Sequence, residues 1–156
     1  ASGLISQTAE GTNKWITTAY TKSELLEKAY GRLKTPVDRI LYVKGTAQIE
    51  HPIASGIRAL ARQSMIGVND QDGAIAISKK EAAKIPAEDI CTKQYFEDFG
   101  GAVIEVWSYD PIILERDGCV DDISLLLSMD NDPNERVQTC LDEIRQKHGL
   151  PIKEEE

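Results

Sequence analysis

Four acidic residues have the type and placement to bind a divalent cation. Glu105 lies inside a strand predicted over residues 102–107, and Asp110 follows the end of that strand. Asp70 and Asp72 lie in a turn that leads into another predicted strand. Carboxylate oxygens are the ligands that Mg²⁺ prefers, and Mg²⁺ with an open position promotes hydrolysis of phosphate esters. A metal-dependent phosphoester hydrolase is therefore one hypothesis, and the alternative is that these residues form turns and one cross-strand pair.

Basic residues form the candidate binding surface. A helix is predicted over residues 52–65, with Arg58 and Arg62 one turn apart on its polar face. A hairpin is predicted over residues 66–77, and three lysines follow it: Lys79, Lys80 and Lys84. A basic helix followed by a two-stranded wing is one way to bind DNA, with the helix in the major groove and the lysines on phosphates. The alternative is that the two arginines only solvate the helix.

Other motifs for catalysis, metal binding or cofactor binding are missing from the sequence. No H-x-x-x-H or HExxH spacing joins His51 or His148 to a second metal ligand. The cysteines are Cys91, Cys119 and Cys140, which are far apart and include no CxxC pair. Neither a G-x-S-x-G nucleophile turn nor a glycine-rich phosphate loop is present. The sequence therefore predicts no metal centre, no cofactor and unreactive core thiols.

The elements that must position these residues are indicated by helix caps and by hydrophobic periodicity. Thr21 to Glu24 and Ser78 to Glu81 are capping boxes, in which a hydroxyl and a carboxylate bond backbone amides at a helix start. Strands are predicted over residues 14–20, 40–43, 74–77 and 102–107, and helices over residues 21–34, 52–65, 86–99, 122–129 and 133–148. This order predicts an α/β or α+β fold, with a mixed central sheet packed by helices and a helical C-terminus.

A single globular domain is predicted over residues 14–150. Residues 1–13 are small and polar without sustained periodicity, which predicts a flexible lead-in or linker. Residues 151–156 end in a lysine and three glutamates, which predicts an acidic, solvated tail. The length of 156 residues is sufficient for a core that needs neither disulfides nor a structural metal.

The charge of the chain is unevenly distributed. The formal net charge is −8, but residues 1–78 carry +2 and residues 79–156 carry −10. The total disfavours a protein whose whole surface attracts nucleic acid or anionic membranes. A polyanion could still bind the first half of the chain, so the net charge restricts the place of such a contact without excluding it.

The function is predicted from the missing catalytic motifs and from the divided charge. We expect a non-catalytic regulatory or interaction domain with a protein partner. Contact with nucleic acid through helix 52–65 and hairpin 66–77 and the metal-dependent hydrolase stay open as alternatives. No apolar run approaches the roughly 18 residues of a membrane helix. No secretory segment precedes the widely spaced cysteines, which predicts a soluble, cytoplasmic protein without a membrane partner.

Overall fold

A computed structural model of the chain describes residues 3–45, 47–67 and 73–152. The chain divides into two compact units. The larger unit comprises residues 35–141, and the smaller unit combines residues 1–34 with residues 142–156. Within the described ranges, no helix is both long enough and apolar enough to cross a membrane.

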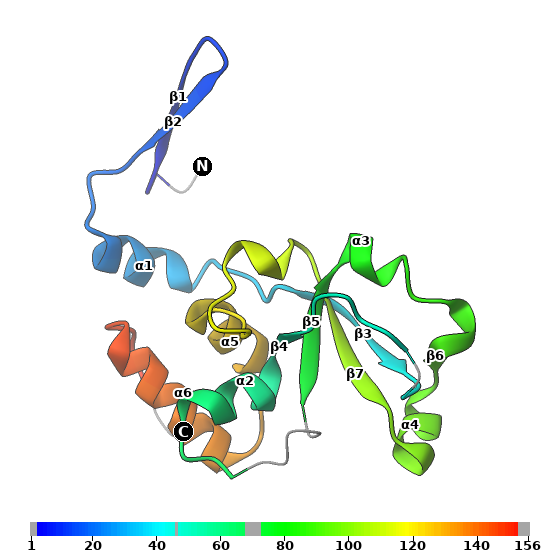
Figure 1. The fold of residues 1–156 in the computed structure, drawn as a ribbon. Helices are drawn as coiled ribbons and strands as arrows, with labels where there is room; N and C mark the ends of the chain where they lie inside the picture. Colours follow the sequence, from blue (N-terminus) through cyan, green and yellow to red (C-terminus); the bar gives the residue numbers. More distant parts are fainter. Residues whose placement is uncertain (1–2, 46, 68–72, 153–156) are drawn as a thin grey trace. The chain divides into compact units, whose positions relative to one another are not determined.

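A mixed sheet of five strands forms the centre of the larger unit (Figure 1). In sheet order the strands are β4 (Ile53–Ala54), β5 (Ala74–Ser78), β7 (Ala102–Trp107), β3 (Val37–Val43) and β6 (Ile90–Cys91). β5 and β7 run parallel, and the other neighbouring pairs are antiparallel. Parallel neighbours need a long crossover, which residues 79–101 provide. The predicted α/β fold with a mixed central sheet is therefore confirmed.

Helices pack against this sheet and against one another. In chain order they are α2 (Gly56–Gln63), α3 (Lys79–Ala82), the 3₁₀ helix η1 (Ala87–Asp89), α4 (Lys93–Phe99), the 3₁₀ helix η2 (Pro111–Ile113), α5 (Asp122–Met129) and the start of α6 (Glu135–Lys147). α2 packs on β5 and on α5, α3 packs on β5 and β7, and α4 packs on β3. The end of α6, from Asp142 onward, belongs to the smaller unit.

Buried aliphatic side chains hold the larger unit together. One cluster joins the sheet to α3, and its buried members are Val43, Ile77, Ala82, Ile104 and Val106. Leu60 of α2 and Leu125 and Leu126 of α5 are fully buried. Burial of one such leucine or isoleucine side chain contributes about 1.5–3 kcal/mol. The apolar faces of the central strands and of α2 and α5 therefore position the surfaces described below.

The smaller unit contains a hairpin, β1 (Ser6–Glu10) with β2 (Asn13–Thr17), and the helix α1 (Lys22–Tyr30). β1 forms inside residues 1–13, where a lead-in without regular structure is predicted. Gly11 has a φ of 63°, which a tight turn between the two strands requires. At the start of α1, Thr21 and Glu24 form the predicted capping box. The division of the chain into a lead-in (1–13), a single globular domain (14–150) and a tail (151–156) remains a prediction.

Three predictions about secondary structure are wrong. The helix expected over residues 52–65 begins only at Gly56, because Ile53 and Ala54 form β4 and pair with β5. The hairpin expected over residues 66–77 does not form in the described part, because β5 has β4 and β7 as its two neighbours. The helix expected over residues 86–99 is divided into η1, β6 and α4. In each case, pairing with a strand that is distant in the sequence decides the structure, against the preference of the local sequence.

Candidate functional site

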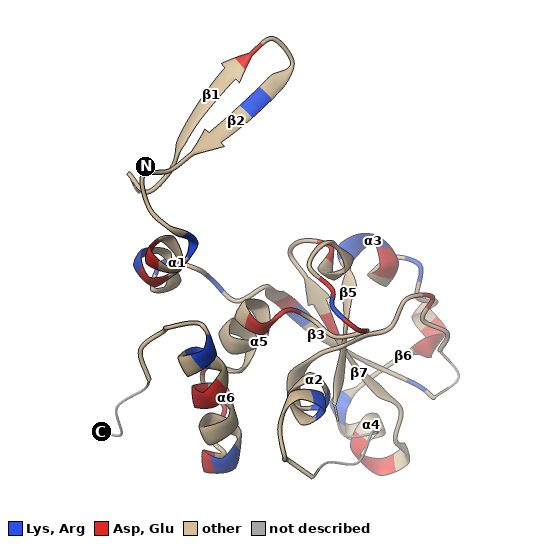
Figure 2. Cartoon of the chain, turned by 60° about the vertical axis from the view of Figure 1, so that its left-hand side comes forward, with Lys and Arg blue, Asp and Glu red and all other residues tan. Residues whose placement is uncertain are grey.

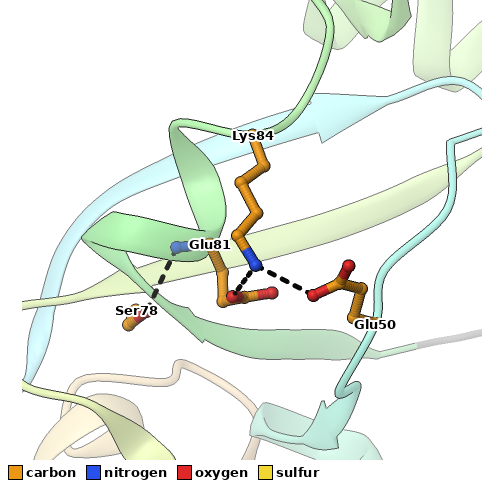
Figure 3. Close-up of polar contacts among 4 residues, drawn as sticks. All are labelled: Glu50, Ser78, Glu81 and Lys84. Carbon is orange, nitrogen blue, oxygen red and sulfur yellow. Dashed lines mark hydrogen bonds and ion pairs between the residues drawn. The ribbon is translucent and has the colours of Figure 1, made fainter.

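Two of the predicted basic residues are paired with carboxylates. Lys79 Nζ lies 3.1 Å from Asp38 Oδ1. Lys84 Nζ lies 2.8 Å from Glu50 Oε2 and 2.6 Å from Glu81 Oε1 (Figure 3). Hydrogen bonds with Glu50 and Glu81 raise the pKa of Lys84, and the bond from Lys84 lowers the pKa of Glu50. Figure 2 shows the resulting mixture of basic and acidic segments on α3, so these lysines offer a polyanion little net positive charge.

The other predicted basic residues are spread over two helices. Arg58 is half-buried, and a Cβ atom placed on Gly73 would lie only 2.4 Å from Arg58 Cβ. Arg62 Nη1 lies 3.5 Å from Cys119 Sγ. Lys80 is exposed on α3. α2 carries basic residues and no acidic residue (Figure 2). Binding of a ligand by these side chains remains a prediction.

A polar cleft lies where the carboxyl ends of β5 and β7 meet. The two parallel strands end opposite each other at Ser78 and Trp107, and this edge of an α/β sheet is a common ligand site. Two cavities of about 170 and 60 Å³ lie there and share Ile77 and Glu81. We call them together the polar cleft, and its polar lining residues are Gln48, Glu50, His51, Ser78, Glu81, Lys84 and Asp110.

Several polar groups of the cleft already have partners within the chain. Besides the Lys84 pairs, Asp110 Oδ1 accepts a hydrogen bond of 3.2 Å from the Ile112 amide and so caps η2. Ser78 Oγ accepts one of 3.2 Å from the Glu81 amide and so caps α3 (Figure 3). Caps of this kind satisfy amides that a helix leaves unpaired at its start. The cleft is therefore held by structural bonds that a ligand would have to replace.

Glu105 has a different environment from Asp110. Its side chain is 8% exposed, and its Oε2 accepts hydrogen bonds of 2.5 Å from Ser55 Oγ and 3.0 Å from Trp107 Nε1. Ser55 immediately precedes α2, whose first residue, Gly56, has a φ of 55°. A carboxylate is favourable at the positive end of a helix. Glu105 therefore anchors the start of α2 to β7.

The acidic residues of the hydrolase hypothesis are described only in part. Glu105 and Asp110 have the separate partners given above, and Asp70 and Asp72 lie outside the described residues. Where the structure describes the chain, no group of three or more His, Cys, Asp or Glu side chains could hold a metal ion. The metal-dependent hydrolase stays a prediction.

A second concave surface, which the sequence does not predict, is formed by the first turn of α2, the segment that follows α2, and the start of α6. It encloses about 470 Å³, within the range of roughly 300–1,000 Å³ that ligand pockets occupy. Met65 is fully exposed there, and Cys140 is a half-buried free thiol. We call this surface the apolar groove, and it is lined by Ile57, Met65, Ile66, Gly67, Asn134, Arg136, Val137, Thr139 and Cys140.

Known proteins provide no template for either surface. The chain matches no protein-family model, no curated protein and no solved structure. The chemistry of the polar cleft and of the apolar groove therefore rests on their own residues.

Proposed function

We propose that this chain is a protein-interaction domain that binds a segment of a partner protein in the apolar groove. The observation that carries the proposal is the full exposure of Met65 at the edge of a concave surface lined by Ile57 and Ile66. Removal of apolar surface from water contributes about 25 cal/mol per Å². Contiguous exposed apolar surface with a polar rim commonly marks a site of association.

The charge arrangement supports a protein partner over nucleic acid. Lys79 and Lys84 are paired with carboxylates, and the chain carries a net charge of −8. Contact of nucleic acid with Arg58 and Arg62 stays the alternative. The cysteines are unpaired, as is usual in a reducing compartment, and this supports our proposal that the domain acts in the cytoplasm.

Selection from a random peptide library displayed on phage, with the purified chain as the target, tests the proposal. We expect synthetic copies of the selected peptides to bind the wild-type chain and to bind Met65→Ser about tenfold more weakly, because loss of one buried apolar anchor costs about 1.4 kcal/mol. Ile113→Ser is the matched control, because Ile113 is 71% exposed and lies outside the groove. Since both side chains are exposed, both variants should keep the wild-type melting temperature.

The chain's own thiols locate the bound peptide. Cys140 lines the groove, whereas Cys91 lies in β6, and both side chains are half-buried. A peptide in the groove should slow alkylation of Cys140 by iodoacetamide and leave the rate at Cys91 unchanged, as read by mass spectrometry. Peptides that bind Met65→Ser normally and leave Cys140 unprotected would remove the groove as the site. Binding of duplex DNA that is lost in Arg58→Ala with Arg62→Ala would instead support the alternative.

A further inference from the structure

We infer that the apolar groove takes an amphipathic helical segment with one carboxylate, which pairs with Arg136. This inference rests on the proposed function and names the chemistry of the partner. Among the residues that the structure describes, Arg136 is the one charged residue that lines the groove, and none of the described lining residues is a carboxylate. Its side chain is exposed, and none of the described residues forms an ion pair with it. The described part of the groove therefore offers apolar surface together with one positive charge that no described carboxylate pairs with.

The position of Arg136 on α6 helps to explain why it forms no ion pair with the described residues. Side chains three and four residues apart are neighbours on a helix, and the residues at these distances further along α6 are Thr139 and Cys140. Arg145 of the same helix differs, because its Nη1 lies 2.6 Å from Asp142 Oδ1, three residues away. Arg136 also lies in the first turn of α6, where the positive end of the helix adds to the attraction for an anion.

The surrounding charge limits the partner to few acidic groups. Asp130, Asp132 and Glu135 precede Arg136 by one to six positions, and exposed charges act over a Debye length of about 8 Å at physiological ionic strength. A strongly acidic segment would be repelled by these carboxylates, whereas a single carboxylate can sit close to Arg136. The partner should therefore be mainly apolar, with its carboxylate beside the apolar face.

Apolar side chains on both walls of the groove suit the apolar face of an amphipathic helix, which is the bound conformation in our inference. The first turn of α2 and the segment that follows this helix supply one side, including Ile57 and Met65, and α6 supplies the other, including Val137. A helix that enters such a groove presents apolar side chains at positions i, i+3 or i+4, and i+7. The volume of about 470 Å³ can take only a few of them, so a short amphipathic segment is sufficient.

The peptides selected on the chain test this inference directly. Each Glu or Asp of a selected peptide is replaced in turn by Gln or Asn, and affinities are measured at physiological salt. We expect one replacement to weaken binding about threefold to fivefold, the upper part of the range for an exposed ion pair. Arg136→Gln should lower the affinity for the original peptide by the same factor. It should cause no further loss of affinity for the peptide whose carboxylate has been replaced. Arg39→Gln is the control, because Arg39 is exposed on β3 and outside the groove.

The outcomes separate this inference from the proposed function. Peptides that depend on Met65 but bind Arg136→Gln as tightly as wild type would overturn the inference and leave the proposed function standing. Selection of peptides with Lys or Arg at the conserved charged position of the selected set would also overturn it. If no selected peptide depends on Met65, the proposed function itself fails. A shared, non-additive loss for the peptide carboxylate and Arg136 supports both.

Discussion

In the polar cleft, charged side chains bond one another or the backbone, whereas the one charged side chain among the described residues of the apolar groove forms no ion pair with any of them. Lys84 bonds Glu50 and Glu81 in the cleft. In the groove, Met65 is fully exposed and Arg136 forms no ion pair with any described residue. A ligand of the cleft must therefore compete with bonds inside the chain, whereas a ligand of the groove gains contacts that are not yet made. This difference is why we assign binding to the groove, although the cleft lies at the edge of the sheet where ligands commonly bind.

The two surfaces also differ in what supports them. α2, which supplies Ile57 to the groove, begins at the buried set of Ser55, Glu105 and Trp107. The cleft is held by ion pairs between side chains that are largely exposed, such as Lys84 and Glu50. Exposed pairs contribute about 0–1 kcal/mol, whereas a buried group left without a partner costs about 1–3 kcal/mol. Substitutions under the groove should therefore have larger effects on folding than substitutions in the cleft.

The largest effect is expected for Glu105→Ala. The change leaves Ser55 Oγ and Trp107 Nε1 without their buried acceptor and should lower the free energy of unfolding by about 3 kcal/mol. Urea unfolding measures this loss. Peptide binding in the groove should weaken as well, because the start of α2 loses its anchor to β7. Glu105→Gln is the control with the same shape, since its amide oxygen can still accept a hydrogen bond. Its free energy of unfolding should fall clearly less than that of Glu105→Ala. Equal losses in the two variants would contradict the acceptor role.

A smaller effect is expected for Gly73→Ala, which adds one methyl group between the start of β5 and α2. The new Cβ atom would lie 2.4 Å from Arg58 Cβ and 2.9 Å from the Arg58 backbone nitrogen. Overpacking of this kind costs about 1–3 kcal/mol, so we expect a loss of about 2 kcal/mol in urea unfolding. Gly31→Ala adds the same methyl group where no atom lies within 4 Å. A loss in Gly31→Ala as large as that in Gly73→Ala would show that close approach to α2 is not the cause.

Tyr109→Phe tests the connection between the residues that follow β7 and α5, the helix that packs against α2. The Tyr109 hydroxyl forms a short hydrogen bond with Ser124 of α5, and its loss should cost about 1 kcal/mol at neutral pH. Burial raises the pKa of Tyr109, and the hydrogen bond with Ser124 opposes this rise in part.

The raised pKa fixes the direction of the pH dependence. The folded state holds the phenol proton more tightly than the unfolded state does. The contribution of Tyr109 to stability is therefore present below the ordinary tyrosine pKa of about 10 and is lost as the pH rises above it. The difference in stability between wild type and Tyr109→Phe should therefore decrease between neutral pH and pH values above about 10. Tyr20→Phe is the control, since Tyr20 is exposed and only its ring contacts Lys28. A difference that grows with pH would contradict the direction of the pKa shift.

Local signals in the sequence were sufficient for much of the fold. The capping box from Thr21 to Glu24, the strand over residues 102–107 and the helix over residues 122–129 are all present in the structure. Each depends on residues within a few positions of one another. β4 was missed because the Pro52 pattern suits a helix start as well as it suits a strand, and the pairing of β4 with β5 depends on residues about 20 positions away.

The surfaces were less predictable than the elements, because each joins distant segments. Lys84 and Asp110 were identified as candidates and do line the polar cleft, but the partner Glu50 lies 34 positions from Lys84. In the groove, Met65 and Val137 belong to opposite walls. The sequence pattern predicts Met65 as the last residue of a helix and Ile66 as the start of a hairpin, and only the packing of α6 shows that both line a groove.

The smallest effect is expected in the polar cleft, for Lys84→Met. The pKa of Glu50 is lowered by the hydrogen bond from Lys84, so it should rise toward the ordinary glutamate value in the variant, as measured by NMR titration of the Glu50 carboxyl. The contribution of Glu50 to the stability of the wild type is present above the ordinary glutamate pKa and is lost as the pH falls through the lowered pKa of the folded state. Because Glu50 and Lys84 are largely exposed, urea unfolding near neutral pH should show no change outside its error.

Lys80→Met is the matched control for this substitution. Lys80 lies on α3, is exposed and forms no ion pair among the residues that the structure describes. It should leave both the pKa of Glu50 and the stability unchanged. Peptide binding in the apolar groove should be the same in both lysine variants, because neither side chain lines it. If Lys84→Met instead destabilised the chain as much as Glu105→Ala, the cleft would support the fold as strongly as the buried set under α2, and the distinction between the two surfaces would be wrong.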